Sequence, residues 1–73
     1  SLGILRKVEL IHGIEWTGDI FPNMIKDYDP SILLDDELAV IQNGELMGSA
    51  RAVAPGWEWP FGPGKLAKSR HRL

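Results

Sequence analysis

Cationic side chains are concentrated near the C-terminal end of the chain, at Lys65, Lys68, Arg70 and Arg72. Residues 60–73 contain no acidic residue and carry a formal charge of +4, whereas residues 1–59 hold four basic and ten acidic side chains, a balance of −6. Such a cluster can attract phosphate groups, because polyanion binding depends on local rather than overall charge. On a strand, Lys68, Arg70 and Arg72 would alternate and share one face. The alternative is a solvated edge strand whose basic residues discourage aggregation.

A second group with chemical potential is aromatic. Trp57, Trp59 and Phe61 alternate within the stretch 55–64, which holds three of the five prolines and three of the eight glycines and is therefore expected to be a loop. Exposed aromatic rings at this spacing can stack on unpaired bases. The structural alternative, which we favour, is that these rings plug the end of a small barrel or anchor the loop. In a longer protein they could also dock against a neighbouring domain.

Metal binding and catalysis have little support in the sequence. His12 and His71 are far apart and lack a third ligand at helix or turn spacing. The acidic run 35–37 lacks the spaced oxygens and late glutamate of a calcium loop, so we interpret it as a solvated turn before a strand. Ser49 has no evident base partner, and no phosphate-cradling glycine motif is present. We therefore expect no metal, no cofactor and no catalytic site in this chain.

Length and composition limit the class of protein. The chain has 73 residues, of which 44% are hydrophobic and 25% charged, and it contains no cysteine. These values are typical of one small globular domain without disulfide bonds. We expect residues 1–73 to form a single module, excised from or part of a longer protein, which is cytoplasmic, monomeric in isolation and not associated with a membrane.

The clearest local signal is a β-hairpin. Residues 37–42 and 45–53 are typical of two antiparallel strands, and Asn43-Gly44 between them tolerates the positive φ angles of a type I′ turn. A two-residue turn fixes the register, so Gln42 should face Glu45, Ile41 should face Leu46 and Val40 should face Met47. Gly48 would then oppose Ala39, where a missing side chain permits a bulge or a close approach of another backbone.

The remaining elements are expected to be short. Residues 6–11 and 65–70 are typical of strands, the apolar pairs around Pro22-Asn23 indicate a bent or edge strand, and residues 13–17 have room for a single helical turn. Five short strands in a chain of this length favour a small closed or half-closed barrel, because closure removes unprotected sheet edges.

Three glycine-centred segments occur in the order and spacing of the PUA domain, which is named after pseudouridine synthases and archaeosine transglycosylases. The first is 18–25 (GDIFPNMI), the second combines 35–40 (DDELAV) with 43–50 (NGELMGSA), and the third is 64–72 (GKLAKSRHR). Within this family, residues 27–32 (DYDPSI) most resemble the version found in archaeal transglycosylases and related archaeal proteins. The resemblance extends over roughly residues 5 to 72.

This resemblance implies a mainly β fold with one or two short helices, a small β-pseudobarrel of five to six strands. It also implies a non-catalytic RNA-binding accessory module that positions tRNA or rRNA for an attached or partner RNA-modifying enzyme. The family's contact surface comprises the first helix, the glycine turn after it, the following strand and the closing strand. Carried over by motif, the RNA-binding residues would be Thr17, Gly18, Asp19, Lys26, Lys65, Lys68, Arg70, His71 and Arg72.

The sequence departs from the family pattern at two points that bear on this function. Asp19 stands where a small neutral residue is common, and a carboxylate there repels phosphate. The acidic residues Asp27, Asp29 and 35–37 must lie away from any RNA-binding face. The alternative hypothesis is a protein-docking barrel that uses the Trp57–Pro63 loop, with no role in RNA binding.

Overall fold

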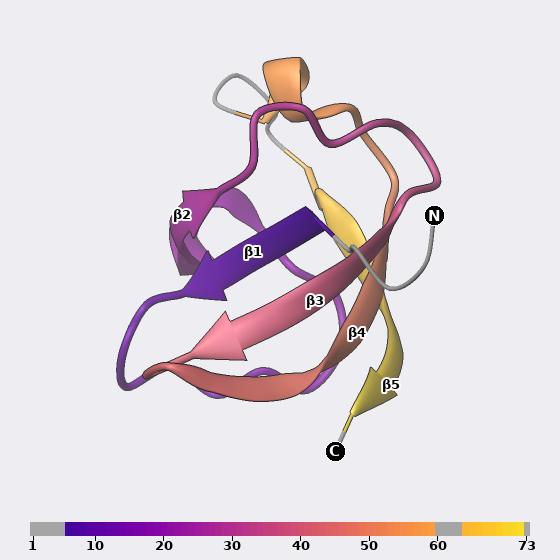
Figure 1. The fold of residues 1–73 in the computed structure, drawn as a ribbon. Helices are drawn as coiled ribbons and strands as arrows, with labels where there is room; N and C mark the ends of the chain where they lie inside the picture. The colour runs from indigo at the N-terminus through magenta and orange to yellow at the C-terminus, as the bar shows by residue number, and fades with distance from the viewer. Residues whose placement is uncertain (1–5, 60–63, 73) are drawn as a thin grey trace.

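The computed structural model describes residues 6–59 and 64–72, which form five strands and two short 3-10 helices. In chain order the elements are β1 (Arg6–Leu10), η1 (Pro22–Met24), β2 (Ile25–Tyr28), β3 (Glu37–Gln42), β4 (Glu45–Ala52), η2 (Gly56–Glu58) and β5 (Ala67–Arg72). The strands form one mixed sheet in the order β2-β1-β3-β4-β5, in which β1 and β3 are parallel and the other neighbours antiparallel (Figure 1). The expected small mainly β domain with short helices is confirmed.

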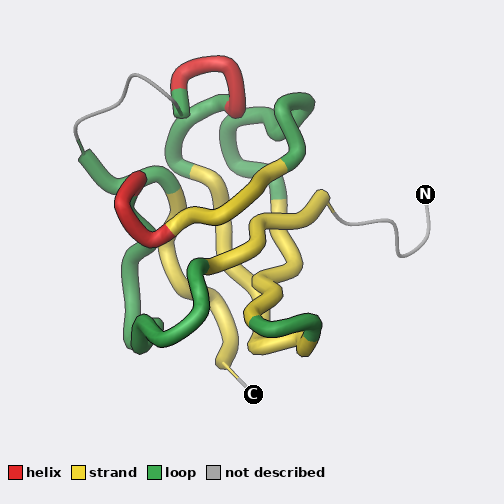
Figure 2. The backbone as a smooth tube through the Cα atoms, turned by 90° about the vertical axis from the view of Figure 1, so that its left-hand side faces the viewer, coloured by secondary structure: helices red, strands yellow, loops and turns green. Residues whose placement is uncertain are grey.

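The sheet curls so that its two edges approach each other through a single bridging residue. Ile20 lies just before η1 and β2, and it forms an isolated antiparallel bridge with Ala67 of β5. Viewed from the side, strands lie at both the front and the back of the molecule (Figure 2). The result is the half-closed barrel expected from five short strands.

Alternating side chains of the central strands fill the barrel. Val8 and Leu10 of β1 and Leu38 and Val40 of β3 are buried, in the period of two that a strand imposes. Ile20 is also fully buried, so the bridging residue belongs to the core. Burying an aliphatic side chain of this size contributes about 1.5–3 kcal/mol, so a few such residues decide the stability of so small a domain.

The predicted hairpin is confirmed at its turn and corrected further along. Asn43 and Gly44 adopt φ angles of 55° and 78°, and the predicted pairs Gln42–Glu45 and Ile41–Leu46 are present. A β-bulge then shifts the register, so that Val40 faces Gly48 and not Met47. The predicted opposition of Gly48 and Ala39 is therefore wrong by one residue.

Gly48 nevertheless permits the close backbone approach that was expected. Its φ is +150°, and a Cβ atom there would collide with the carbonyl oxygen of His71 and lie 2.9 Å from the Cα atom of Arg72. The absence of a side chain at position 48 thus lets the end of β5 pack directly against β4.

Other boundaries differ modestly from expectation. The last strand runs over Ala67–Arg72 and not 65–70. Residues 11–19 form a loop with a turn at 12–13, and the helical turn for which residues 13–17 have room is not formed. The short helices instead follow Gly18, at η1, and lie within the aromatic loop, at η2. Pro22 explains the first, because a proline suits the start of a helical turn.

The aromatic residues divide between core and surface. Trp59 is 1% exposed, and its indole Nε1 donates to the carbonyl oxygen of Ala54 at 2.8 Å. The centroids of the Trp59 and Tyr28 rings lie 5.0 Å apart. Trp59 therefore plugs the barrel, as favoured from the sequence. Trp57 is 67% exposed. Phe61 lies outside the described residues. No helix among the described residues is long and apolar enough to cross a membrane.

Candidate nucleic-acid interface

The turn at Gly18-Asp19 lies directly beside the basic C-terminal strand. The backbone N–H of Ile20 donates to the carbonyl oxygen of Ala67 at 2.9 Å, and the N–H of Leu66 donates to the carbonyl oxygen of Ile20 at 2.7 Å. These paired bonds attach the segment after the turn to the start of β5. The segments 16–20 and 64–72, here called the cradle, are thus neighbours in space although about 45 residues separate them in the sequence.

Trp16 holds the turn in place. Its buried indole donates through Nε1 to the carbonyl oxygen of Gly18 at 2.6 Å, and its own carbonyl oxygen accepts a hydrogen bond from Arg72 Nη1 at 3.4 Å. Trp16 therefore joins the turn to the far end of β5. No hydrogen bond within the described residues uses the backbone N–H groups of Gly18 or Asp19, and both residues are half-buried.

The loop that leads to this turn is anchored by a buried amide. Gln42, at the end of β3, donates through Nε2 to the carbonyl oxygens of Ile11 and Ile14 at 2.9 and 2.8 Å. His12 Nδ1 lies 2.6 Å from Asn43 Oδ1 at the hairpin turn. Neither Gln42 nor Trp16 was predicted to support this turn. A polar residue at an inward position of an apolar strand, following Leu38 and Val40, is the signal that identifies Gln42 as a buried hydrogen-bonding group.

The basic residues differ in their ion pairing. Arg6 lies 3.6 Å from Asp36, Lys26 3.6 Å from Glu9, Arg51 3.9 Å from Asp35 and Lys65 3.4 Å from Asp19. Within residues 6–59 and 64–72, four cations form no ion pair with a carboxylate. These are Lys7, Lys68, Arg70 and Arg72. Three of the four lie on β5, so the unneutralised positive charge of the described residues is concentrated there.

A bulge changes how the β5 side chains are presented. Ser69 pairs with Ala50 and His71 with Ser49, so Arg70 is an extra residue opposite the step between the two β4 partners. The alternation predicted to place Lys68, Arg70 and Arg72 on one face is therefore interrupted, and the guanidinium of Arg72 reaches back to Trp16. Lys68, Arg70, His71 and Arg72 are all exposed.

Asp19 is partly neutralised by its neighbour in the cradle. Its Oδ2 lies 3.4 Å from Lys65 Nζ, and the two side chains are 35% and 44% exposed. The repulsion of phosphate expected from the sequence at this position is thus reduced by a cation next to it. Exposed pairs of this kind contribute little to stability, which leaves both groups free to exchange partners.

The two other predicted residues, Thr17 and Lys26, lie in different parts of the molecule. Thr17 is exposed at the turn beside Gly18. Lys26 lies on β2, the strand at the other end of the sheet order from β5, and is held by Glu9 of β1. The structure thus brings together the turn residues and the β5 residues, and it joins Lys26 to an acidic neighbour instead.

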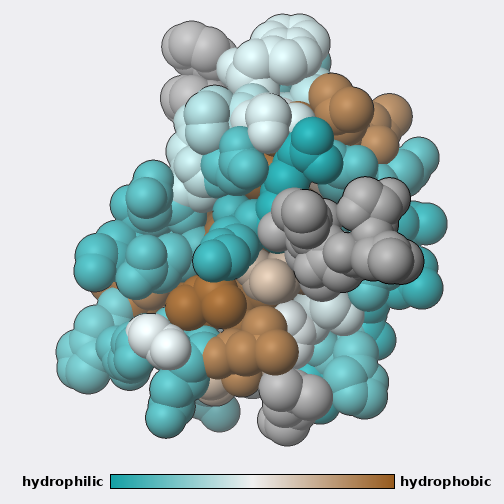
Figure 3. Space-filling view, viewed as in Figure 1, coloured by the Kyte–Doolittle hydropathy of each residue, from teal (hydrophilic) through white to brown (hydrophobic). Residues whose placement is uncertain are grey.

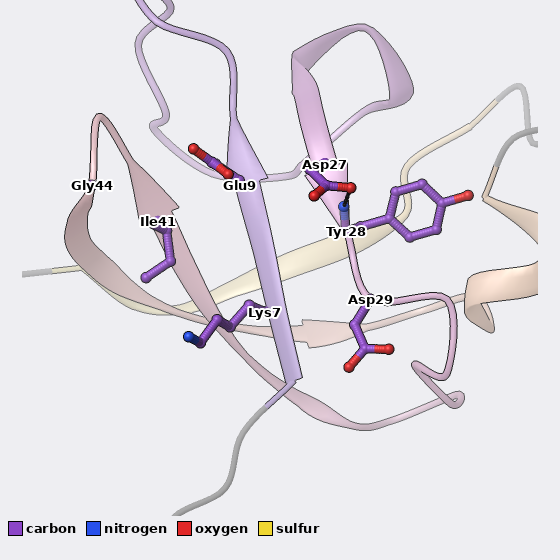
Figure 4. Close-up of a pocket in the computed structure, with 7 residues that line it drawn as sticks. All are labelled: Lys7, Glu9, Asp27, Tyr28, Asp29, Ile41 and Gly44. Carbon is purple, nitrogen blue, oxygen red and sulfur yellow. Dashed lines mark hydrogen bonds between the residues drawn. The ribbon is translucent and has the colours of Figure 1, made fainter.

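Acidic residues line a shallow groove over β2, β1 and β3. It has a volume of about 560 Å³ and is lined by Lys7, Glu9, Asp27, Tyr28, Asp29, Ile41 and Gly44 (Figure 4). Asp27 and Asp29 therefore lie on β2 and just after it, not on β5. Asp35 and Asp36 are engaged by Arg51 and Arg6. Asp27 and Asp29 thus lie over β2 and β1, whereas Asp35 lies beside Arg51, the cross-strand neighbour of Lys68.

Asp29 also has a structural role at this groove. Its Oδ1 accepts hydrogen bonds from the hydroxyl of Ser31 at 2.7 Å and from the backbone N–H of Ser31 at 2.9 Å. These bonds, of which the one from the hydroxyl has the larger effect, lower the pKa of the Asp29 carboxyl from its ordinary value, with a smaller contribution from Arg6.

Over the described ranges, no three His, Asp or Glu side chains lie close enough together to hold a metal ion.

Comparison with known proteins shows similarity in fold. The crystal structure of AF0587, an archaeal protein of unknown function, matches with a TM-score of 0.75 and 22% sequence identity. The match covers 92% of this chain and 24% of AF0587, so the shared fold makes up about a quarter of that longer protein. No family model matches the sequence, and no curated protein matches it.

Proposed function

We propose that this domain is an RNA-binding accessory module that positions tRNA or rRNA for an RNA-modifying enzyme, attached or partnered. One observation carries this proposal: the Gly18 turn is hydrogen-bonded beside β5, the strand that holds three of the four unpaired cations of the described residues. The resemblance of three segments to the PUA domain supports the same role. Occurrence of the fold within the much longer AF0587 is consistent with a module of a larger protein.

The chemistry of the cradle suits a sugar-phosphate backbone. Lys68, Arg70 and Arg72 neutralise phosphates, and the N–H groups of Gly18 and Asp19, which no described residue engages, donate to phosphate or ribose oxygens. Contacts of this type position an RNA without reading its sequence, which suits an accessory module. Apart from Asp19, which Lys65 pairs, the cradle contains no acid.

Salt dependence of RNA binding tests the proposal. If about four cations neutralise phosphates, the logarithm of affinity for single-stranded RNA falls with the logarithm of salt concentration at a slope near −3, and a duplex gives a steeper slope. A slope near zero would contradict the proposal, since contacts to phosphate release counterions.

Charge reversal locates the interface. We expect Lys68→Glu combined with Arg70→Glu to abolish RNA binding while the thermal unfolding transition is retained, because both side chains are exposed. The single variants Lys68→Glu and Lys7→Glu form a matched pair, since both replace an exposed strand lysine that has no ion pair within the described residues. Lys68→Glu should weaken binding strongly and Lys7→Glu only slightly. Equal effects would exclude β5 as the specific interface.

Exposed apolar side chains favour a second candidate function, protein docking. Trp57 is 67% exposed, and Leu33 and Leu34 are 57% and 58% exposed. The η2 segment is joined to the loop of the two leucines, because Gly56 N–H donates to the carbonyl oxygen of Ile32 at 2.7 Å. In Figure 3 a brown apolar patch lies at the upper right, where the loop between β2 and β3 runs in Figure 1, while the top of the molecule is pale. A docking function would give RNA-independent association that Trp57→Ala weakens and salt barely changes.

A further inference from the structure

Asp19 is an acidic group placed among donors. Within the cradle segments 16–20 and 64–72 it is the one carboxylate, it lies 3.4 Å from Lys65, and it directly precedes Ile20, which is bonded to Ala67 at the start of β5. A phosphate has only acceptor oxygens, so a carboxylate here hinders phosphate binding. The fold does not need this carboxylate, since the turn is held by Trp16 and by the backbone bonds of Ile20.

The Lys65 ion pair leaves acceptor capacity on Asp19. A carboxylate has about four lone-pair positions, and the one partner within the described residues is Lys65 Nζ, at 3.4 Å from Oδ2. Asp19 is also 35% exposed, so an incoming ligand can reach it. The pair therefore lowers the local repulsion of phosphate and still presents an oxygen that accepts hydrogen bonds.

One group of a ribonucleic acid backbone can donate to that oxygen. Phosphate and ring oxygens only accept, whereas the ribose 2′-hydroxyl donates as well and is the group by which proteins distinguish RNA from DNA. Hydrogen bonds to an ionised acceptor are shorter and stronger than neutral ones. We infer that Asp19 accepts a hydrogen bond from a ribose 2′-hydroxyl and thereby makes the cradle selective for RNA over DNA. This inference rests on the proposed RNA-binding function.

The test compares oligonucleotides that differ only at the 2′ position. Single strands of adenine and cytosine are made as RNA, DNA and 2′-fluoro RNA, which lacks the 2′-hydroxyl, and their affinities for the 73-residue chain are measured at one salt concentration. The wild type should bind RNA about tenfold more tightly than either analogue, the factor expected of one hydrogen bond to a charged group. Asp19→Ala should reduce this ratio to about one.

Two variants separate hydrogen bonding from charge. Asp19→Asn keeps a carbonyl acceptor and removes the charge, so it should raise affinity for all three strands and keep a higher RNA-to-DNA ratio than Asp19→Ala. Glu45→Ala removes an exposed carboxylate at the hairpin, outside the cradle, and should leave the ratio unchanged. Thermal unfolding of each variant shows that the domain remains folded.

The outcomes separate the inference from the proposed function. If the wild type prefers RNA and Asp19→Ala keeps the same ratio, Asp19 does not read the 2′-hydroxyl, while RNA binding itself stands. If Asp19→Ala raises affinity for RNA and DNA equally, Asp19 acts only as a repulsive charge and the inference is wrong. If the wild type binds neither RNA nor DNA, the proposed function fails, and the inference fails with it.

Discussion

Ile20 and Ala67 form a backbone bridge across the seam of the barrel, with the N–H of Ile20 2.9 Å from the carbonyl oxygen of Ala67. Both residues are fully buried, so the bridge is protected from water. Because Ile20 directly follows the Gly18-Asp19 turn, this contact places the turn at the start of the basic strand.

Substitution by alanine should destabilise the domain at Gly48 and leave its stability nearly unchanged at Gly18. At Gly48 an added Cβ meets the backbone of His71 and Arg72, and φ is +150°, so Gly48→Ala should lower the free energy of unfolding by about 2–3 kcal/mol. At Gly18 nothing lies within 4 Å of an added Cβ, so Gly18→Ala should change stability by less than about 0.5 kcal/mol. Urea unfolding measures both values.

Gly18→Ala should nevertheless weaken RNA binding, because its methyl group would occupy the open space through which a backbone approaches the turn. Fluorescence anisotropy with labelled single-stranded RNA measures this. Unchanged affinity in a folded Gly18→Ala variant would show that RNA does not approach the turn closely.

Trp16→Phe tests how firmly the turn must be held. The substitution removes the Nε1 donor to Gly18 and keeps most of the buried ring, so we expect a loss of about 1 kcal/mol in stability. RNA affinity should fall because the turn is no longer fixed beside Arg72. If Trp16→Phe loses this stability but binds RNA as tightly as the wild type, the position of the turn does not matter for binding.

Gln42→Met should destabilise the loop over residues 11–19. Methionine is of similar length but cannot donate to the carbonyl oxygens of Ile11 and Ile14, so two acceptors lose their partner at a cost of about 2 kcal/mol. In this variant the rate of amide hydrogen exchange should increase in the loop, while it stays nearly unchanged in β3 and β4. Uniformly faster exchange would show that Gln42 supports the whole barrel and not the loop.

The carboxyl of Asp29 should make stability depend on pH at the acidic end of the range. Its pKa is lower in the folded state than the ordinary value of 3.8, mainly because the Ser31 hydroxyl and N–H donate to it. The stabilisation is therefore present above the unfolded-state pKa and is lost as pH falls through the folded-state pKa.

Ser31→Ala removes the largest cause of this shift. An NMR titration of the Asp29 side-chain carbon should give a higher pKa in Ser31→Ala than in the wild type. If the two titration curves coincide, the hydroxyl of Ser31 does not hold the carboxylate in solution.

Local patterns predicted much of this fold, and the limits of that prediction have physical causes. The Asn43-Gly44 turn could be predicted because both residues tolerate positive φ angles, and the strand 37–42 because its apolar residues alternate. Both are properties of a short segment of the sequence. The bulge between Val40 and Ile41 and the close approach of β5 to Gly48 are contacts between strands, which a local pattern does not contain. For the same reason the bulge at Arg70 interrupted the predicted alternation of basic residues.

The candidate site was predicted in part. Charge clustering predicted the basic residues that lie on β5, and the resemblance to the PUA domain predicted that the Gly18 turn lies beside them. The partner of each cation is a tertiary property, so pairing of Lys26 with Glu9 and of Lys65 with Asp19 could not be read from the sequence. Trp16 was missed because one aromatic residue in a polar loop gives no periodic signal.

The most direct test of RNA binding at the cradle is an NMR titration of the ¹⁵N-labelled domain with tRNA at low salt. We expect amide shifts clustered at residues 17–20 and 65–72, with β1 and β2 largely unchanged. Shifts confined to the η2 segment at 56–58, or no shifts at all, would contradict this expectation.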